Sequence, residues 1–409
     1  MALHESPAAA TVMTAPDTPR PGLVVVIAFV VTLAGRFTLT RAGLDIPVAN
    51  DVRVPLFLIL LLCLVLEAHQ VGRRPAKGGS ALLGILLLFG YQGLSVLWVP
   101  PGSVTGPALG DLCAVTVLLV IYFNLAAWDR DRVTEMTLKL FYVAAWIYFV
   151  AAAAGLGRHE AGRWAALGGG PNVFVRIMIM GVFTSFYLYL RSGERLMWLA
   201  SIPVFLFGAI ASGSRGGLLS FAITVAVALL AIRPRIDIHR IARPLALLAV
   251  VAVILVITAG PSIADFVQKR FLESTVGEGY TSDRDVLAQT ALRIFWQRPL
   301  LGAGLNGFHT IADLGFGERY VHNLPLSIAA EGGFVGLALL VLAWLGLWQA
   351  YTAVPVRERS LESRIAAYCG IFMGATSLFS GDYYDARLMW IFLLLAVVRP
   401  VRAPASLAR

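Results

Sequence analysis

Three residues have side chains suited to group transfer and lie at the ends of apolar segments. They are Arg215 in the stretch SGSRGGLLS, Arg284 at the start of an amphipathic stretch, and His322 before a long apolar run. A guanidinium group can bind two phosphate oxygens at once, and a neutral imidazole can take a proton from an attacking hydroxyl. Together these residues could bind a phosphate-bearing donor and activate a nucleophile.

Each of these residues also has a plainer explanation. An arginine at the end of a membrane helix often extends its charge to the lipid headgroups, which would account for Arg215. Arg284 has an acid on either side and could form a weak surface ion pair, and His322 could simply cap a helix. The small residues around Arg215 favour a functional role, because they let a neighbouring helix or a ligand approach the backbone closely.

Five further polar residues are candidate substrate contacts. Arg176 falls inside an apolar segment, where a charge is costly unless it faces a polar cavity or a partner. The others lie near the predicted outer ends of apolar segments and could contact substrate or pair with one another: Asn172, Asn323, Glu331 and Asp382. No second His or carboxylate lies at metal-ligand spacing from His322, so neither a metal site nor a cofactor is predicted.

The elements that must hold these residues are predicted to be membrane helices. The chain has 409 residues, of which 58% are hydrophobic and only 14% charged, and its mean hydropathy is +0.77. Soluble proteins are typically about 25% charged, so a water-exposed surface is excluded for most of the chain. The apolar blocks are continuous, which predicts an all-α polytopic membrane protein rather than a β-barrel. Membrane topology accounts for the net charge of +9, so no nucleic-acid partner is predicted.

About twelve transmembrane helices are predicted. Their approximate ranges are 22–39, 54–68, 80–98, 107–127, 137–154, 172–190, 197–213, 216–232, 244–260, 324–350, 364–380 and 386–399. The segment 1–21 is rich in Ala, Pro and Thr and is expected to form a disordered cytoplasmic tail. No basic stretch directly precedes the first apolar run, so this segment does not have the pattern of a cleaved signal peptide.

The positive charges predict the orientation of these helices. Most Lys and Arg residues of the short connecting segments fall on one side when the N-terminus is cytoplasmic. The first nine helices then occupy 22–260, the last three occupy 324–399, and the tail 400–409 is cytoplasmic. The long segment 261–323 becomes an extracytoplasmic subdomain, in which 283–296 has the spacing of an amphipathic helix. We expect this partly helical subdomain to lie on the outer surface of the membrane.

Four motifs, in this order, resemble the core of the O-antigen ligase and Wzy-type polymerase superfamily. They are GGGPNV at 168–173, SGSRGGLLS at 212–220, the stretch at 283–308, and VHNLPLSIAAEGGFVG at 321–336. The resemblance covers about residues 165–345, and the predicted helix layout agrees with it elsewhere. The order and spacing of the motifs across a long outer loop are more specific than any one of them.

The resemblance implies a bacterial glycosyltransferase of the C type in the cytoplasmic membrane. Such enzymes move a glycan from undecaprenyl pyrophosphate to a hydroxyl of a glycan or glycolipid acceptor at the outer face, without a metal ion. For this sequence, the resemblance implies that Arg215 and Arg284 bind the pyrophosphate and that His322 activates or positions the acceptor. It assigns no role to Arg176.

Two alternatives remain open at this stage. A polymerase, which joins one lipid-linked repeat to another, shares these motifs with a ligase, which moves a finished chain to a different acceptor. The chain length and the single long outer loop lean slightly toward a ligase. An anion or solute transporter would also contain buried arginines, but the two halves show no internal repeat of the kind usual in transporters.

Overall fold

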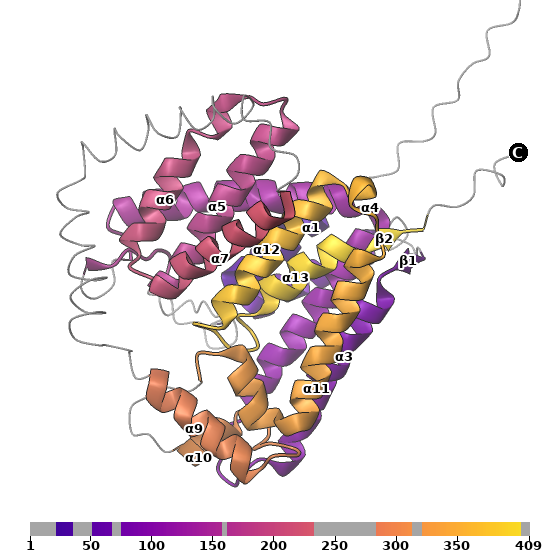
Figure 1. Ribbon diagram of the computed structural model, residues 1–409, viewed down its shortest axis with the longest axis vertical. Coiled ribbons are helices and arrows are strands. Elements are labelled where there is room, and N and C mark those ends of the chain that lie inside the picture. Colours follow the sequence, from indigo (N-terminus) through magenta and orange to yellow (C-terminus); the bar gives the residue numbers. More distant parts are fainter. Residues whose placement is uncertain are drawn as a thin grey trace, which may run out of the picture.

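The computed structural model is almost entirely helical (Figure 1) and describes residues 22–35, 51–67, 75–157, 162–232, 284–312 and 321–401. Within these residues it contains twelve α-helices and one antiparallel pairing, of β1 (Ala76–Lys77) with β2 (Arg399–Pro400). The predicted tail 1–21, the predicted helix 244–260 and the first part of the predicted outer loop, 261–283, lie outside the described residues.

Four of the described helices are long and apolar enough to cross a membrane. They are α3 (Gly79–Leu94) with the short turn that continues it to Trp98, α4 (Gly106–Ala153), α5 (Pro171–Arg191) and α11 (Leu324–Thr352). The shorter helices are α1 (Gly22–Ala34), α2 (Arg53–Glu67), α6 (Ser201–Ala211), α7 (Arg215–Ile232), α9 (Arg284–Gln297), α10 (Gly307–Ala312), α12 (Leu361–Ser377) and α13 (Arg387–Val397). The helical class is therefore confirmed, whereas the count of twelve spans stays a prediction.

The label α4 covers two helices that meet at a kink. The sequence predicts separate helices at 107–127 and 137–154, and both are present, joined without the longer connection that was expected. Between them lies a kink at Asp129, whose φ of −155° and ψ of 88° are not helical. The Asp129 carboxylate accepts a hydrogen bond from the amide of Arg132 (3.0 Å), as a residue that caps a helix start does. The charged residues in this region therefore mark a kink and a new helix start rather than a loop.

The short helix α13 forms the centre of the bundle. All its residues except Leu393 are buried, and it packs against α12, α4 and α11. The ring of Trp390, 1% exposed, meets the ring of Phe89 edge to face at 6.2 Å. Eleven residues are too few to cross a bilayer, which takes about 20. The helix is surrounded by protein, and its N-terminal end carries the segment 378–386, which leads into the site described below.

The loop after α9 packs into a break in α11. The break is at Gly333, whose φ is 60°. The amide of Gly304 donates to the carbonyl of Glu331 (2.8 Å). The amide of Ala303 donates to the carbonyl of Ala330 (2.9 Å). The loop thus satisfies backbone groups that the broken helix cannot pair internally. This docking holds α9 and α10 against α11, beside the end of α3 (Figure 1).

Gly302→Ala is expected to weaken this docking. Gly302 has a φ of 72°, and an added Cβ would lie 2.3 Å from the carbonyl carbon of Glu331. The backbone conformation alone disfavours a side chain by about 1–3 kcal/mol, and the clash adds to this. We expect a lower thermal unfolding midpoint in detergent, measured by near-ultraviolet circular dichroism. Gly102→Ala is the matched control, since Gly102 has a φ of 87° but open space around it. An equal loss in both variants would contradict a role for the close contact.

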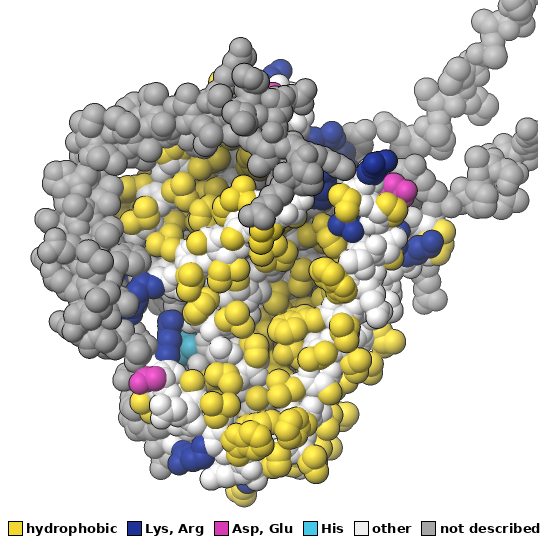
Figure 2. Space-filling model, viewed as in Figure 1, with side chains coloured by type: hydrophobic (Ala, Val, Ile, Leu, Met, Phe, Trp, Pro, Cys, Tyr) yellow, Lys and Arg dark blue, Asp and Glu magenta, His cyan; other side chains and the backbone are white. Residues whose placement is uncertain are grey.

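Much of the described surface is apolar, as lipid contact requires (Figure 2). Leu97 is 82% exposed and Trp348 is 64% exposed. Soluble proteins rarely expose large apolar side chains over a wide surface. Basic side chains gather near the β1–β2 pairing, at one end of the apolar face (Figure 2). The distribution is that of a multi-pass membrane protein.

Candidate functional site

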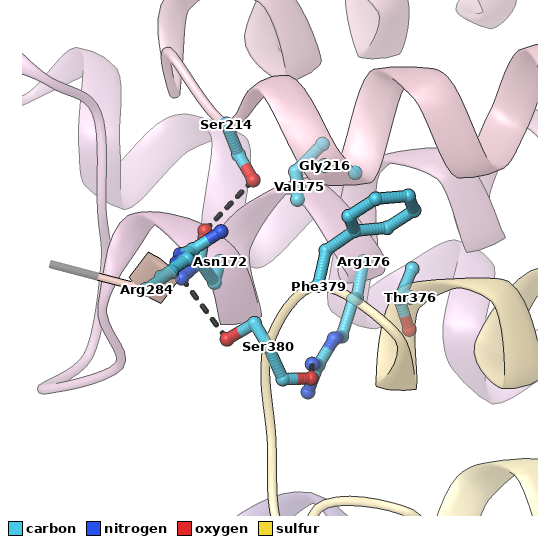
Figure 3. Close-up of a pocket in the computed structure, with 10 residues that line it drawn as sticks. Asn172, Val175, Arg176, Ser214, Gly216, Arg284, Thr376, Phe379 and Ser380 are labelled. Atoms are coloured by element: carbon cyan, nitrogen blue, oxygen red, sulfur yellow. Dashed lines mark hydrogen bonds between the residues drawn. The ribbon is translucent and has the colours of Figure 1, made fainter. Parts of the chain in front are cut away.

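A narrow pocket lies where three helices begin (Figure 3). These starts are Pro171 of α5, Arg215 of α7 and Arg284 of α9. The lining residues come from the first turns of these helices, from the end of α12 and from the segment after it: Asn172, Val175, Arg176, Ser214, Gly216, Gly217, Arg284, Thr376, Phe379 and Ser380. A helix start carries free N–H groups and about half a positive charge. Three such starts around one pocket favour an anion.

The charged side chains of this pocket are also positive. Arg176 and Arg284 line it, and none of its described lining residues is acidic. Arg176 is 7% exposed, donates from Nη2 to the carbonyl of Ser380, and has Nη1 3.9 Å from Oδ2 of Asp385. This buried charge therefore has both the polar partners and the polar cavity that its position in an apolar segment demands.

Asn172 connects the elements that surround the pocket. Its Oδ1 accepts a hydrogen bond from Oγ of Ser214 (2.8 Å), and its Nδ2 donates to Oγ of Ser380 (3.1 Å), as Figure 3 shows. The side chain thus joins the start of α5 to the start of α7 and to the segment after α12. The structure gives Asn172 a positioning role in addition to its place on the pocket wall.

Arg215 lies at the edge of the pocket rather than on its wall. It is the first residue of α7, between the lining residues Ser214 and Gly216. The glycines beside it permit close packing, because a Cβ at Gly216 would lie 2.5 Å from the Cβ of Phe379. Gly217, the next residue, is packed equally closely against α5. The sequence suggested that these small residues allow the close approach of either a neighbouring helix or a ligand. The structure shows the close approach of neighbouring protein segments.

His322 lies on a segment that connects the wall of a second cavity to a residue bonded next to this pocket. The residue before it, Val321, lines the cavity. The residue after it, Asn323, caps α11 by accepting from the amide of Leu326 (3.0 Å) and donates to the carbonyl of Leu378 (3.0 Å), next to the pocket wall. The φ of His322 is 61°, a conformation that few non-glycine residues adopt. The chain is therefore held tightly on both sides of the imidazole.

The second cavity has a volume of about 570 Å³ and takes its walls from four regions of the chain. These are the start of α4, the region of α10, the start of α11 and the segment between α12 and α13: Val104, Pro107, Ala108, Asp111, Leu305, Asn306, His309, Val321, Ser327, Glu331, Asp382, Tyr383 and Tyr384. Two of the predicted substrate contacts, Glu331 and Asp382, line this cavity. The structure thus divides five of the predicted site residues between the basic pocket and this cavity, which we call the acidic cavity, whereas Arg215, His322 and Asn323 line neither.

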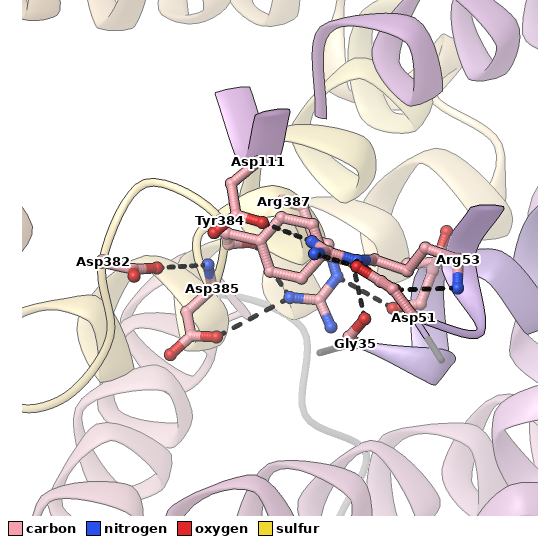
Figure 4. Close-up of polar contacts among 9 residues, drawn as sticks. Gly35, Asp51, Arg53, Asp111, Asp382, Tyr384, Asp385 and Arg387 are labelled. Atoms are coloured by element: carbon pink, nitrogen blue, oxygen red, sulfur yellow. Dashed lines mark hydrogen bonds and ion pairs between the residues drawn. The ribbon is translucent and has the colours of Figure 1, made fainter. Parts of the chain in front are cut away.

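A network of charges holds the segment between α12 and α13 (Figure 4). Arg53, at the start of α2, pairs with both Asp51 and Asp111. The ring of Tyr384 contacts two guanidinium groups, those of Arg53 (4.9 Å) and Arg387 (4.2 Å). Burial alone would raise the pKa of Asp51, but the hydrogen bonds from Arg53 bring this pKa below its usual value. The network ties α2 and α4 to the residues that line the cavity.

Replacing Arg53 alone is expected to destabilise the protein more than replacing Arg53 and Asp111 together. Arg53→Met leaves Asp111, whose side chain is only 9% exposed, without this cation. Breaking a buried pair in this way costs about 3–5 kcal/mol, and the partial exposure of Arg53 favours the lower end. The measurement is thermal unfolding in detergent, with Arg53→Met/Asp111→Asn as the matched double variant. The double variant should recover part of the loss, and no recovery would show that the pair is not what stabilises this region.

Sequence reasoning missed several residues of the two regions. Ser380 presents its hydroxyl and carbonyl beside the pocket, and Asp111 and Tyr383 line the cavity. The stretch GDYYDAR carried a signal for Tyr383, since it places acids, tyrosines and a base next to an apolar helix. Nothing in the sequence marks Ser380, because small hydroxyl residues are common throughout membrane helices.

Residues 199–341 match the Wzy_C family model, which is described as O-antigen ligase. The match runs from just before α6 into α11 and contains Arg215, Arg284 and His322, whereas Asn172 and Arg176 precede it. No curated protein matches the chain.

Proposed function

Because residues 199–341 form an O-antigen ligase domain, the protein is a glycosyltransferase of that family, and we propose that it takes its glycan from undecaprenyl pyrophosphate. The acceptor is a hydroxyl of a glycan or glycolipid at the outer face of the cytoplasmic membrane. One observation carries this proposal, namely the basic pocket formed where α5, α7 and α9 begin. Its helix starts and its two lining arginines suit the four non-bridging oxygens of the pyrophosphate, which share two negative charges, better than a neutral ligand. The pocket has a volume of only about 10 Å³, so its walls must move apart when a pyrophosphate binds.

In the proposed complex, the pyrophosphate lies against Arg176 and Arg284. Arg215, at the start of α7, adds its charge from the edge of the pocket. The Arg176 guanidinium is already held in place before the reaction by its hydrogen bond to the carbonyl of Ser380. Fixed positive groups stabilise the charge that the leaving pyrophosphate gains as its bond to the sugar breaks.

The chemical step is a substitution at the anomeric carbon of the glycan. The acceptor oxygen forms the new bond to this carbon, and the bond from the carbon to the pyrophosphate oxygen breaks. The electron pair of that bond leaves with the pyrophosphate, while the proton of the acceptor hydroxyl passes to His322. The products are the glycosylated acceptor and undecaprenyl pyrophosphate. The segment that carries His322 adjoins both the cavity and the pocket, through Val321 and Asn323, which suits this residue to the task.

Contacts between helix ends support the proposed orientation, with both termini cytoplasmic. At one end, β1 pairs with β2, and both belong to segments predicted to be cytoplasmic. At the other end, the hydroxyl of Tyr384, in a segment predicted to be outside, donates to the carbonyl of Gly35 (3.2 Å), in the last part of the first predicted helix before its outer end. The positive-inside assignment therefore groups segments that also meet in space.

A reconstituted transfer assay tests the proposed function. Purified protein in liposomes would receive a short glycan on undecaprenyl pyrophosphate, with EDTA present, and the products would be identified by mass spectrometry. Glycan moved to a separate acceptor identifies a ligase, and a lengthened lipid-linked glycan identifies a polymerase. Anion flux into the liposomes without any new glycosidic product would contradict glycosyl transfer and indicate a transporter.

A further inference from the structure

We propose that the acidic cavity is a saccharide-binding subsite, which holds a sugar of the donor or of the acceptor beside the reacting bond. The proposal rests on the proposed function, because it assigns the sugar and the pyrophosphate to two different compartments. Its first support is the contrast between their walls. The cavity is lined by Asp111, Glu331 and Asp382 and by no Lys or Arg among the described lining residues. The cavity wall therefore offers a phosphate no positively charged Lys or Arg side chain, in contrast to the basic pocket.

The carboxylates of the cavity are not arranged as a metal site. In the part of the chain that the structure describes, no three His, Cys, Asp or Glu side chains are grouped so that they could hold a metal ion. Carboxyl groups also form hydrogen bonds with hydroxyl groups, as acceptors when ionised and as both donors and acceptors when protonated. A sugar offers many hydroxyls and no net charge, so it suits this wall.

One buried hydroxyl group of the cavity wall makes no hydrogen bond within the described structure. It is Oγ of Ser327, in a residue 4% exposed. Buried polar groups are nearly always paired, so this hydroxyl points to a partner that binds there. The phenol of Tyr383, in a residue 9% exposed, lies on the same wall beside the Glu331 carboxyl, and burial and this carboxyl raise the pKa of Tyr383 well above 10.0. The phenol therefore keeps its proton and remains a hydrogen-bond donor.

The size and position of the cavity fit the same assignment. Its volume of about 570 Å³ lies within the usual range for small-ligand sites, roughly 300–1,000 Å³. It adjoins the basic pocket through one short segment, in which Ser380 lines the pocket and Asp382 lines the cavity. Val321 places the cavity directly before His322 in the chain. A sugar in the cavity would thus adjoin both the pyrophosphate pocket and the segment that carries the group proposed to take the proton.

The test separates sugar binding from pyrophosphate binding. Two probes are used in lipid nanodiscs: the free oligosaccharide released from the donor by mild acid, and sugar-free undecaprenyl pyrophosphate. The variants Tyr383→Phe and Ser327→Ala each remove one hydroxyl and almost no volume. Tyr142→Phe is the control, because its hydroxyl bonds to Ser201 (2.6 Å) away from the cavity. Saturation-transfer NMR gives the Kd of the oligosaccharide, and calorimetry gives the Kd of the lipid.

We expect Tyr383→Phe and Ser327→Ala each to weaken oligosaccharide binding about three- to tenfold, the usual effect of one uncharged hydrogen bond. Binding of the sugar-free lipid should not change in these variants, whereas Arg284→Ala should weaken the lipid and spare the oligosaccharide. In transfer assays, the substrate whose KM rises identifies the donor or the acceptor as the source of the bound sugar.

Unchanged oligosaccharide binding in both hydroxyl variants would overturn the subsite. Equal loss of oligosaccharide binding in Arg284→Ala would also overturn it, because the sugar would then lie in the basic pocket. Either result leaves glycosyl transfer standing as long as the unaltered protein forms product. Absence of product with the unaltered protein would instead count against the proposed function.

Discussion

Arg284→Ala is expected to slow glycan transfer by about 10²–10³-fold. Arg284 is the residue of α9 that lines the basic pocket. In the sequence it is distant from the residues of α5 and α7 that line the same pocket. Its guanidinium group would stabilise the charge that develops on the leaving pyrophosphate. The side chain is half-buried at a helix start and contributes little to the core, so the fold should survive its loss. Initial rates in liposomes, at saturating donor and acceptor, measure the effect.

Two variants on the same helix control this prediction. Arg293→Ala removes an exposed arginine that does not line the pocket, and transfer should stay within about twofold of the unaltered rate. Arg284→Lys keeps the charge but loses the fork that binds two oxygens, so it should recover only part of the rate. Arg284→Ala with a normal rate, or Arg293→Ala with an equal loss, would contradict pyrophosphate binding in this pocket.

The same assay separates two expectations for Arg215. The family resemblance implies that it binds the pyrophosphate directly, which predicts a loss as large as that of Arg284→Ala. The structure places Arg215 at the edge of the pocket, at the start of α7. A much smaller loss in Arg215→Ala would indicate that the helix start and its charge act at longer range.

Replacement of His322 is expected to lower the rate of transfer by about 10²–10⁴-fold, the usual contribution of a positioned acid or base. The choice of replacement is decisive, because the φ of His322 is 61°. Alanine would add backbone strain at this position, whereas glycine adopts it freely and asparagine tolerates it. His322→Gly and His322→Asn therefore remove the imidazole with little change in the chain path.

The pH dependence of the rate shows whether the imidazole acts as a base. If His322 takes the proton of the acceptor, the rising limb of kcat against pH should disappear in His322→Gly, and added imidazole should restore part of the rate. Normal thermal unfolding of the variant in detergent is the control for folding. A near-normal rate in His322→Gly would rule out proton transfer to this residue.

The sequence predicted most helices but not how they share the site. Continuous apolar runs and the Gly- and Pro-rich breaks between them placed α5, α7, α11, α12 and α13 to within a few residues. The predicted break at 128–136 is shortened to the kink at Asp129, because the second helix starts directly after this residue, whose carboxylate caps it. Such a distinction depends on tertiary packing, which the pattern of apolar residues does not record.

The composition of the candidate site was harder to predict than its general position. Each of Asn172, Arg176 and Arg284 could be selected because its type is unusual in its surroundings. Their meeting in one pocket depends on how α5, α7 and α9 cross, and no local pattern encodes that crossing. For the same reason, Glu331 and Asp382 fell into one predicted group with Arg176, although they line a different cavity. The break in α11 at Gly333, which brings Glu331 to the cavity, also depends on a loop that docks from elsewhere.

The most direct test of the account is a cryo-electron microscopy structure with a glycan on undecaprenyl pyrophosphate bound. We expect density for the two phosphates between Arg176 and Arg284, against the starts of α5, α7 and α9, with His322 facing the anomeric carbon. Density for the phosphates at any other place, with the basic pocket left unfilled, would contradict the assignment of this pocket to the pyrophosphate.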